Sequence, residues 1–203
     1  MKRILTRHGQ TDWNAAQRFQ GQSDVPLNEA GIQQATALAD RLSREQIDHI
    51  YTSDLQRAHE TARLIAVHHT CEIYTDPRLR EMNFGAWEGL TYAEIKKNNP
   101  AILAVWEADI LTTSAPNGET LNQLSARVQS MLNDLRAQHA DQTVLIVAHG
   151  GPLQVLLCLA LNMSPAMYWH FRLSPASLSE IAFYSAGAII NLMNDTSHLE
   201  SIA

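Results

Sequence analysis

The sequence predicts an α/β fold in which a mostly parallel central sheet lies between two layers of helices, a three-layer α/β/α sandwich. Short apolar segments that suit strands alternate with longer segments whose apolar residues recur about every 3.6 positions. The segment TVLIVA at residues 143–148 is a continuous apolar run, typical of a parallel strand buried on both faces. No repeat, low-complexity segment or linker divides the 203 residues, so we expect one domain over residues 1–203.

Strands and helices alternate in the first half of the chain. The three expected strands lie at residues 2–6, 49–52 and 71–75. Asn28 is a good N-cap for the first long helix, and Ser53 and Asp54 have side chains that suit the cap of the second. The apolar residues on one face of the first long helix are Ile32, Ala35, Leu38, Ala39 and Leu42.

The second half begins with less regular patterns. Residues 92–111 are predicted to be helical with a break near Pro100, and TSAPNGET at residues 113–120 is a loop. We expect this region, at about residues 91–120, to be a lid-like insertion that sets specificity. The remaining elements are a long amphipathic helix at 121–139, the strand at 143–148, an apolar helix at 153–161, and two strands at 178–184 and 188–193 that form a hairpin.

Composition and charge limit the function. The chain has 45% apolar and 18% charged residues, as an ordinary globular protein has. Its net charge of −6 disfavours nucleic acid and anionic membranes as partners, and no stretch reaches the ~18 apolar residues of a membrane span. Cys71 and Cys158 lie far apart without metal-ligand spacing, which predicts free thiols in a reducing compartment and no metal site. The N-terminus lacks an apolar signal segment, so we expect a cytoplasmic protein.

Two predicted strands end in similar tripeptides, Arg7-His8-Gly9 and His149-Gly150-Gly151. Ligands of open α/β sheets bind just beyond the carboxyl ends of the strands, so we expect both histidines in one crevice. A glycine after each histidine permits a tight turn and the close approach of a ligand. The amides that begin the helix after Gly150 are suited to face an anion.

Two arginines make a phosphate the expected ligand. Arg57 lies about one turn into the helix that follows the strand 49–52, near the same edge of the sheet as Arg7. Two permanently charged, planar guanidinium groups suit a tetrahedral oxyanion. One histidine between them can stay neutral and attack phosphorus, while the other donates hydrogen bonds to the developing charge. Phosphoryl transfer needs mainly positioning and charge neutralisation, which this set offers without a metal or another cofactor.

A leaving alkoxide also needs a proton donor. The loop REMNFGAWEG at residues 80–89 carries two carboxyl groups among aromatic rings, Glu81 and Glu88. A carboxylic acid beside apolar rings keeps its proton more readily, which suits a general acid. The residues themselves do not decide between the two.

Six ordered segments of this chain resemble the histidine phosphatase superfamily, in its phosphoglycerate mutase-like branch. The segments are LTRHGQTDWN (5–14), DVPLNEAG (24–31), YTSDLQRAHETA (51–62), LREMNFGAWEG (79–89), PNGET (116–120) and VAHGG (147–151). The tripeptide RHG alone would be a weak signal, but the ordered set is a strong one and spans nearly the whole chain. The resemblance implies the phosphoglycerate mutase-like α/β fold and phosphatase activity.

The resemblance also implies roles for individual residues. His8 would be the nucleophile that becomes a phosphohistidine, and Glu81 would be the proton donor. The residues that would complete the phosphate pocket are Arg7, Arg57 and His149. Those that would line the pocket or contact phosphate are Asn14, Gln20, Gly21 and Gly150.

Departures from the family's mutases favour a phosphatase. Residues 91–120 contain Lys96 and Lys97 but no arginine, whereas cofactor-dependent mutases carry a longer insertion with a lysine and an arginine pair. WEAD, PNGET and YWHFRLSPASLSEI are similar to α-ribazole phosphatases of cobalamin assembly and also to metal-independent phosphoserine phosphatases. The segment Trp169 to Arg172 favours the α-ribazole ester.

Several alternatives stay open. They are a phosphoserine or broad-specificity phosphatase, a phosphoglycerate mutase, and a catalytically silent protein that binds a phosphorylated ligand. Trp106 and Trp169 are first of all packing residues, but they could also form an apolar wall for a nucleoside-like leaving group, and His170 could meet that group. The expected partner is a small phosphorylated metabolite, and the oligomeric state is open, a homodimer among the options.

Overall fold

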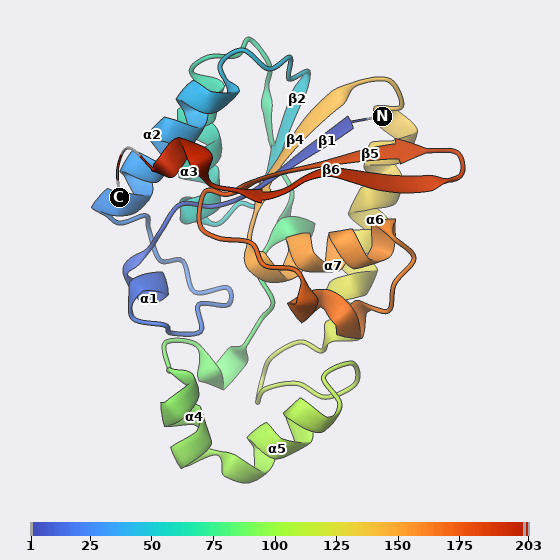
Figure 1. The fold of residues 1–203 in the computed structure, drawn as a ribbon. Helices are drawn as coiled ribbons and strands as arrows, with labels where there is room; N and C mark the ends of the chain where they lie inside the picture. The colour runs from blue at the N-terminus through green and yellow to red at the C-terminus, as the bar shows by residue number, and fades with distance from the viewer. Residues whose placement is uncertain (1, 201, 203) are drawn as a thin grey trace.

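The computed structural model describes residues 2–200 and 202, and its centre is a six-stranded sheet (Figure 1). The strands are β1 (Lys2–Arg7), β2 (His49–Thr52), β3 (Ile73–Thr75), β4 (Thr143–Ala148), β5 (Leu178–Tyr184) and β6 (Gly187–Asp195). Their order is β3-β2-β4-β1-β5-β6; the first four are parallel, and β5 runs antiparallel to both β1 and β6. The predicted, mostly parallel sheet with a terminal hairpin is confirmed.

Helices connect the strands. The α-helices are α1 (Asp12–Ala15), α2 (Glu29–Leu42), α3 (Gln56–Ala66), α4 (Tyr92–Asn98), α5 (Pro100–Ala108), α6 (Leu121–Gln138) and α7 (Gly150–Ala160). The 3-10 helices are η1 (Pro77–Leu79), η2 (Gly85–Trp87), η3 (Pro165–His170) and η4 (Ser197–Leu199). The break predicted near Pro100 separates α4 from α5, and α7 begins three residues earlier than the predicted residue 153.

Side chains on alternate faces of the strands divide the buried core between two layers of helices. Successive side chains of a strand point to opposite faces of the sheet. Leu5 and Ile146 therefore pack in one cluster with residues of α6 and α7, while Ile4 and Leu145 pack in the other with residues of α2 and α3. Helices thus cover both faces, as the sandwich prediction requires.

Two local predictions were wrong. Ile32 is 46% exposed, because α2 buries a narrower stripe that runs from Gly31 through Ala35 to Leu42 and leaves Ile32 outside it. Neither Ser53 nor Asp54 caps α3: the N-cap is Leu55, without a side-chain hydrogen bond, and the first helical amide, that of Gln56, donates to Asp24. The partner of this first amide, Asp24, comes from a distant part of the chain, and the local sequence pattern does not indicate such a contact.

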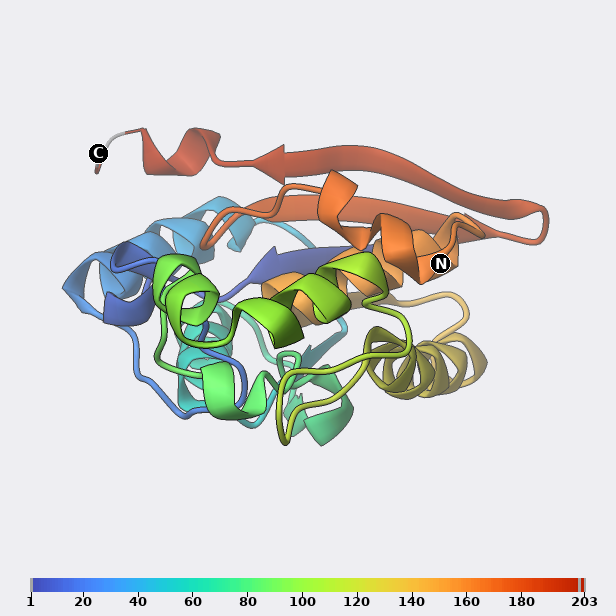
Figure 2. The same cartoon turned by 90° about the horizontal axis from the view of Figure 1, so that it is seen from below.

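Residues 91–120 form the small helices α4 and α5 and the loop that leads to α6. They lie on the side of the sheet where β1 and β4 end (Figures 1 and 2). A separate cluster of buried residues holds them, made of Trp87, Ile95, Leu103 and Ala115. That this segment acts as a lid stays a prediction.

Both cysteines are free, Cys158 buried and Cys71 partly so, which confirms the predicted thiols. In the described part of the chain, no helix is both long enough and apolar enough to cross a membrane.

Candidate active site

The ends of β1 and β4 bring the two histidines together. Arg7 lies opposite Ala148 in the parallel register, and the amide of His8 donates to the carbonyl of Ala148 over 2.9 Å. The imidazole centroids of His8 and His149 are 5.0 Å apart, with the rings inclined at 61°. Both side chains are buried, with 1% and 0% exposure. The similar tripeptides thus meet because their strands are adjacent and parallel.

Hydrogen bonds give the two imidazoles opposite tautomers. His8 Nδ1 lies 2.6 Å from the carbonyl oxygen of Gly9, which can only accept, so Nδ1 carries the proton and Nε2 keeps its lone pair. Arg57 Nε donates to His149 Nδ1 over 3.2 Å, so the proton of neutral His149 sits on Nε2. That Nε2 is buried and finds no hydrogen-bond partner among the described residues. One ring therefore offers a lone pair, and the other an unsatisfied N–H group.

Arg57 is fully buried and fixed by backbone carbonyls. Its Nη1 donates to the Ser23 carbonyl over 2.8 Å, and its Nη2 donates to the Gly21 carbonyl over 2.7 Å. With the bond to His149, three of the five N–H groups of the guanidinium are used, which leaves two for an anion. Arg57 can thus orient His149 and bind a ligand at once.

Arg7 approaches the same histidine pair from the end of β1. Its Nη1 donates to the Leu173 carbonyl over 2.8 Å, and its buried Nε has no hydrogen-bond partner among the described residues. Burial lowers the pKa of Arg7, while the nearby negative charge of Glu81 works in the opposite direction. The cationic group is therefore only partly compensated, as a site for an anion requires.

The two candidate carboxyl groups have different surroundings. Glu88 accepts hydrogen bonds from the amides of Gln22, Ser23 and Phe84 and from the Ser23 hydroxyl, and thus ties the 20–23 loop in place. Glu81 Oε1 accepts from the amides of Met82 and Gly151 over 2.8 and 3.0 Å. Glu81 Oε2 has only a long 3.4 Å contact from the Gly151 amide. Glu81 thus lies at the start of α7 with one oxygen nearly free.

Electrostatics keep both histidines neutral. Burial, and then the positive charge of Arg57, lower the pKa of His8 and of His149 well below the usual value of 6.5. Arg7 adds to the shift in both cases. Neutral imidazoles are the form in which one ring can act as a nucleophile and the other as a hydrogen-bond donor.

The depressed histidine pKa values predict how stability depends on pH. Below about 6.5 the unfolded chain binds protons at these histidines and the folded chain does not, so the free energy of unfolding falls as pH falls. The expected contribution is about 1.4 kcal/mol per pH unit for each histidine. Urea unfolding between pH 7.5 and 5 should show a shallower slope for His8→Ala than for wild type. The matched variant at exposed His59, His59→Ala, should keep the wild-type slope; equal slopes for all three proteins would contradict the prediction.

The remaining predicted residues take supporting positions. Asn14 Oδ1 accepts from the amide of Thr11 within the capping box of α1, and Gln20 Oε1 accepts from the Thr11 hydroxyl. Gly21 has φ of +55°, and a Cβ there would overlap Glu88, so only glycine places this carbonyl against Arg57. An added Cβ on Gly150 would lie 3.7 Å from Glu81 Oε2 and 4.0 Å from Arg7 Cζ, which puts Gly150 beside the charged groups. Contact of these four residues with phosphate stays a prediction.

The sequence reasoning missed Arg127, which holds the Glu81 segment. Its Nη1 donates to the carbonyls of Arg78 and Arg80, each over 2.6 Å, and its Nη2 donates to the carbonyl of Glu81 over 2.9 Å. Glu119 pairs with the same guanidinium at 2.6 Å and also accepts from the amide of Asn83. An arginine on an amphipathic helix is normally a surface residue, so no local signal marks Arg127.

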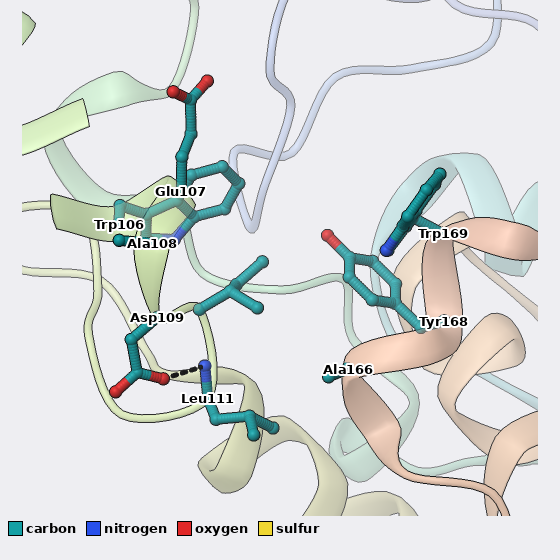
Figure 3. Close-up of a pocket in the computed structure, with 9 residues that line it drawn as sticks. Trp106, Glu107, Ala108, Asp109, Leu111, Ala166, Tyr168 and Trp169 are labelled. Atoms are coloured by element: carbon teal, nitrogen blue, oxygen red, sulfur yellow. Dashed lines mark hydrogen bonds between the residues drawn. The ribbon is translucent and has the colours of Figure 1, made fainter. Parts of the chain in front are cut away.

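A cavity of about 400 Å³ lies between η3 and the segment that runs from the end of α5 to Leu111 (Figure 3). Trp106 lies on one side of it, and Tyr168 and Trp169 of η3 lie on the other. The prediction that both tryptophans can wall one space therefore fits the structure. His170 does not line the cavity; its ring stacks beside Trp169, with the ring centroids 3.9 Å apart.

Comparison with known proteins agrees with the fold and with the ordered segments. The model of the histidine phosphatase superfamily (branch 1) matches residues 3–196. Phosphoserine phosphatase 1 of Hydrogenobacter thermophilus is 34% identical over 98% of this chain and 94% of its own length. A Proteus mirabilis protein named "Probable phosphoglycerate mutase GpmB" is 36% identical over 98% of this chain and 95% of its own length. The crystal structure of the alpha-ribazole phosphatase from Shigella flexneri superposes with a TM-score of 0.90 and 30% identity, and covers 96% of each chain.

A helix-covered parallel sheet with two histidines at the ends of its central strands defines a phosphoglycerate mutase-like α/β protein. The chain belongs to the histidine phosphatase superfamily, as the sequence predicted. It is an enzyme of the phosphatase class.

Proposed function

We propose that the protein is a metal-independent phosphomonoesterase that hydrolyses a small phosphorylated metabolite through a phosphohistidine at His8. The observation that carries this proposal is the pair of neutral, buried imidazoles with opposite tautomers between Arg7 and Arg57. His8 Nε2 has a lone pair for phosphorus, and His149 Nε2 has an N–H for a phosphoryl oxygen. Arg7 and Arg57 add the positive charge that a transferring phosphoryl group requires.

The first step transfers the phosphoryl group to the enzyme. His8 Nε2 forms a bond to phosphorus while the bond from phosphorus to the ester oxygen breaks. Glu81, acting from its carboxylic acid form, gives its proton to that oxygen, so the leaving group departs as an alcohol. Its free Oε2 is the atom suited to carry this proton, because Oε1 accepts two backbone amide hydrogen bonds.

The second step regenerates the enzyme. The Glu81 carboxylate takes a proton from water, whose oxygen attacks phosphorus as the bond to His8 Nε2 breaks. Inorganic phosphate leaves, and both His8 and Glu81 return to their starting protonation states. Transfer to a second substrate hydroxyl in place of water would make the same site a mutase.

Our preferred substrate is α-ribazole 5′-phosphate. Support comes from the aromatic residues of the cavity between α5 and η3 and from the likeness to the Shigella flexneri structure. The alternative substrate is phosphoserine, supported by the Hydrogenobacter thermophilus relative. A third possibility is that the enzyme is a phosphatase of broad specificity. A phosphoglycerate mutase is less favoured although a relative carries that name, because residues 91–120 hold no arginine.

Phosphate release in EDTA tests the proposal directly. The substrates are α-ribazole 5′-phosphate, phosphoserine and 3-phosphoglycerate, each also assayed with His8→Ala. We expect His8-dependent release of phosphate from at least one ester and no requirement for a bisphosphorylated primer. Absence of release from all three and from a wider panel of phosphate esters, or full activity in His8→Ala, would contradict the proposal. Primer-dependent isomerisation without release of phosphate would identify a mutase.

Arg127 should position Glu81 for the protonation of poor leaving groups. Replacing it with methionine, Arg127→Met, removes the hydrogen bonds to three carbonyls of residues 78–81 and the ion pair with Glu119. We expect kcat/KM for aliphatic esters to fall on the order of 10²-fold, the scale of general acid catalysis. The loss for 4-nitrophenyl phosphate should be much smaller, because its leaving group needs no proton.

A double-variant comparison distinguishes this role from general destabilisation. In a Glu81→Gln background, Arg127→Met should not change the ratio of aliphatic to aryl ester activity any further. An equal loss on both ester types in the single variant would show that Arg127 supports the fold and not the position of Glu81.

A further inference from the structure

The walls of the cavity between α5 and η3 come from two segments that are far apart in the sequence. Trp106, Ile110 and Leu111 come from α5 and the segment that follows it, and Tyr168 and Trp169 come from η3. In Figure 3 the Tyr168 and Trp169 rings face the side that carries Trp106 and Leu111. The volume of about 400 Å³ lies within the range of about 300–1,000 Å³ that is common for small-molecule sites.

Several contacts link η3, one wall of the cavity, and the segment after it to elements that carry residues of the proposed phosphoryl site. Burial, and then the negative charge of Glu81, raise the pKa of the Tyr168 phenol to about 12. Hydrogen bonds join the segment after η3 to α7 and to the end of β1: Gln154 of α7 donates to the Phe171 carbonyl over 2.5 Å, and Arg7 of β1 donates to the Leu173 carbonyl. A leaving group attached to a phosphate between Arg7 and Arg57 is therefore close to the segment that follows η3, and η3 forms one wall of the cavity.

The aromatic walls favour a flat ring. Trp169 is 67% exposed, so much of its indole is open to a ligand. Trp106 is held in place by an edge contact with buried Trp87, with ring centroids 5.5 Å apart. Rigid aromatic surfaces of this kind stack well on planar ligands.

The charges of the cavity disfavour carboxylates. Of the described residues that line it, the charged ones are Glu107 and Asp109, and none is lysine, arginine or histidine. Glu107 accepts from the Tyr92 hydroxyl over 2.6 Å, and Asp109 accepts from the amide of Leu111 over 3.1 Å, so both carboxylates are held where they are. A leaving group with its own carboxylate, such as serine or glycerate, would find no cation among these lining residues to pair with.

We propose that this cavity is the leaving-group subsite and that it selects an uncharged or cationic planar ring over a carboxylate-bearing group. The inference rests on the proposed function and sharpens it, because it assigns specificity to Trp169 and Glu107. It favours a nucleoside-like ester over an amino acid or sugar acid ester for a reason independent of any relative.

Two esters that are phosphorylated at the same carbon allow the contribution of the aromatic ring to kcat/KM to be measured apart from phosphoryl transfer itself. Ribose 5-phosphate and α-ribazole 5′-phosphate differ at C1 of the pentose, which carries a hydroxyl in the first and an aromatic base in the second. Wild type should hydrolyse the α-ribazole ester with the higher kcat/KM. Trp169→Ala should lower that value roughly tenfold, the scale of one stacked ring, and change the value for ribose 5-phosphate less than twofold. Trp169→Phe, which keeps a ring, should retain most of the preference.

A charge reversal tests the second half of the inference. Glu107→Lys places a cation at the cavity, so kcat/KM for phosphoserine should rise several-fold while that for the α-ribazole ester changes little. The matched control is Asp141→Lys, which makes the same charge change before β4, at the opposite end of that strand from His149. An equal rise in both lysine variants, or none in Glu107→Lys, would overturn the assignment of specificity to charge.

Binding of the product tests the cavity without turnover. Dephosphorylated α-ribazole should quench tryptophan fluorescence saturably in wild type and in His8→Ala, and much more weakly in Trp169→Ala. No saturable quenching, together with equal kcat/KM for the two pentose esters, would overturn the subsite while His8-dependent phosphate release still supported the proposed function. Quenching without any phosphate release would keep the binding site and contradict the proposed function.

Discussion

Replacing His8 with alanine should abolish turnover while leaving the fold intact. The variant removes the lone pair that we propose forms the bond to phosphorus, and loss of a nucleophile lowers kcat by on the order of 10³-fold or more. The strand that carries His8 keeps its register, because the amide at this position and not the side chain donates to Ala148. Steady-state kinetics on the best substrate and a thermal melt of the same preparation measure the two expectations.

The expected loss in His8→Ala is specific to turnover. Binding of inorganic phosphate should persist, because Arg7, Arg57 and His149 stay in place. A rate within tenfold of wild type in a folded His8→Ala protein would remove His8 from the role of nucleophile.

The second large effect is expected for Arg57→Ala. This change removes two N–H donors for the phosphoryl group and also the Nε–H that fixes the tautomer of His149. We expect kcat/KM to fall on the order of 10²- to 10³-fold, about 3–4 kcal/mol of transition-state stabilisation. The carbonyls of Gly21 and Ser23 lose their partner as well, so the free energy of unfolding should decrease.

Arg57→Lys separates charge from geometry. Lysine keeps the positive charge but lacks the planar group that reaches two carbonyls and His149 together. It should recover only a small part of the lost kcat/KM. Full recovery would mean that charge alone matters, and an unchanged kcat/KM in Arg57→Ala would remove this residue from the phosphate pocket.

Much of the architecture could be predicted because its signals are local. A histidine followed by glycine comes just after each of two apolar segments, the strand at residues 2–6 and the run at residues 143–148. Adjacent parallel strands bring such ends together, and the structure pairs β1 with β4 in that way. The proximity of His8 to His149 therefore follows from sheet topology, without any knowledge of side-chain contacts.

Other features depend on contacts between distant segments. The loop sequence did not separate Glu81 from Glu88, because the difference lies in the amides that bind Glu88 from residues 22 and 23. The cap of α3 likewise comes from Asp24 and not from the adjacent serine. Arg127 has a surface-helix pattern but reaches three loop carbonyls. Patterns of period two or 3.6 carry no information on such contacts.

The proposed leaving-group subsite is built from the least predictable part of the chain. The sequence indicates that Trp106 and Trp169 are large apolar residues, but only the fold places the 106–111 segment opposite η3. The acidic rim at Glu107 and Asp109 also emerges only from this arrangement. Loops of this kind vary freely because the core does not constrain them.

Trapping the phosphoenzyme tests the central claim most directly. Wild type and His8→Ala are mixed with excess substrate, quenched in base within milliseconds, digested and analysed by mass spectrometry, because a phosphorus–nitrogen bond survives base and is lost in acid. We predict a base-stable, acid-labile phosphoryl group on the peptide that contains His8 in wild type, and none in His8→Ala. A phosphoryl group on another residue, or phosphate release at the full rate with no phosphoenzyme at any time point, would contradict the proposal that His8 is the nucleophile.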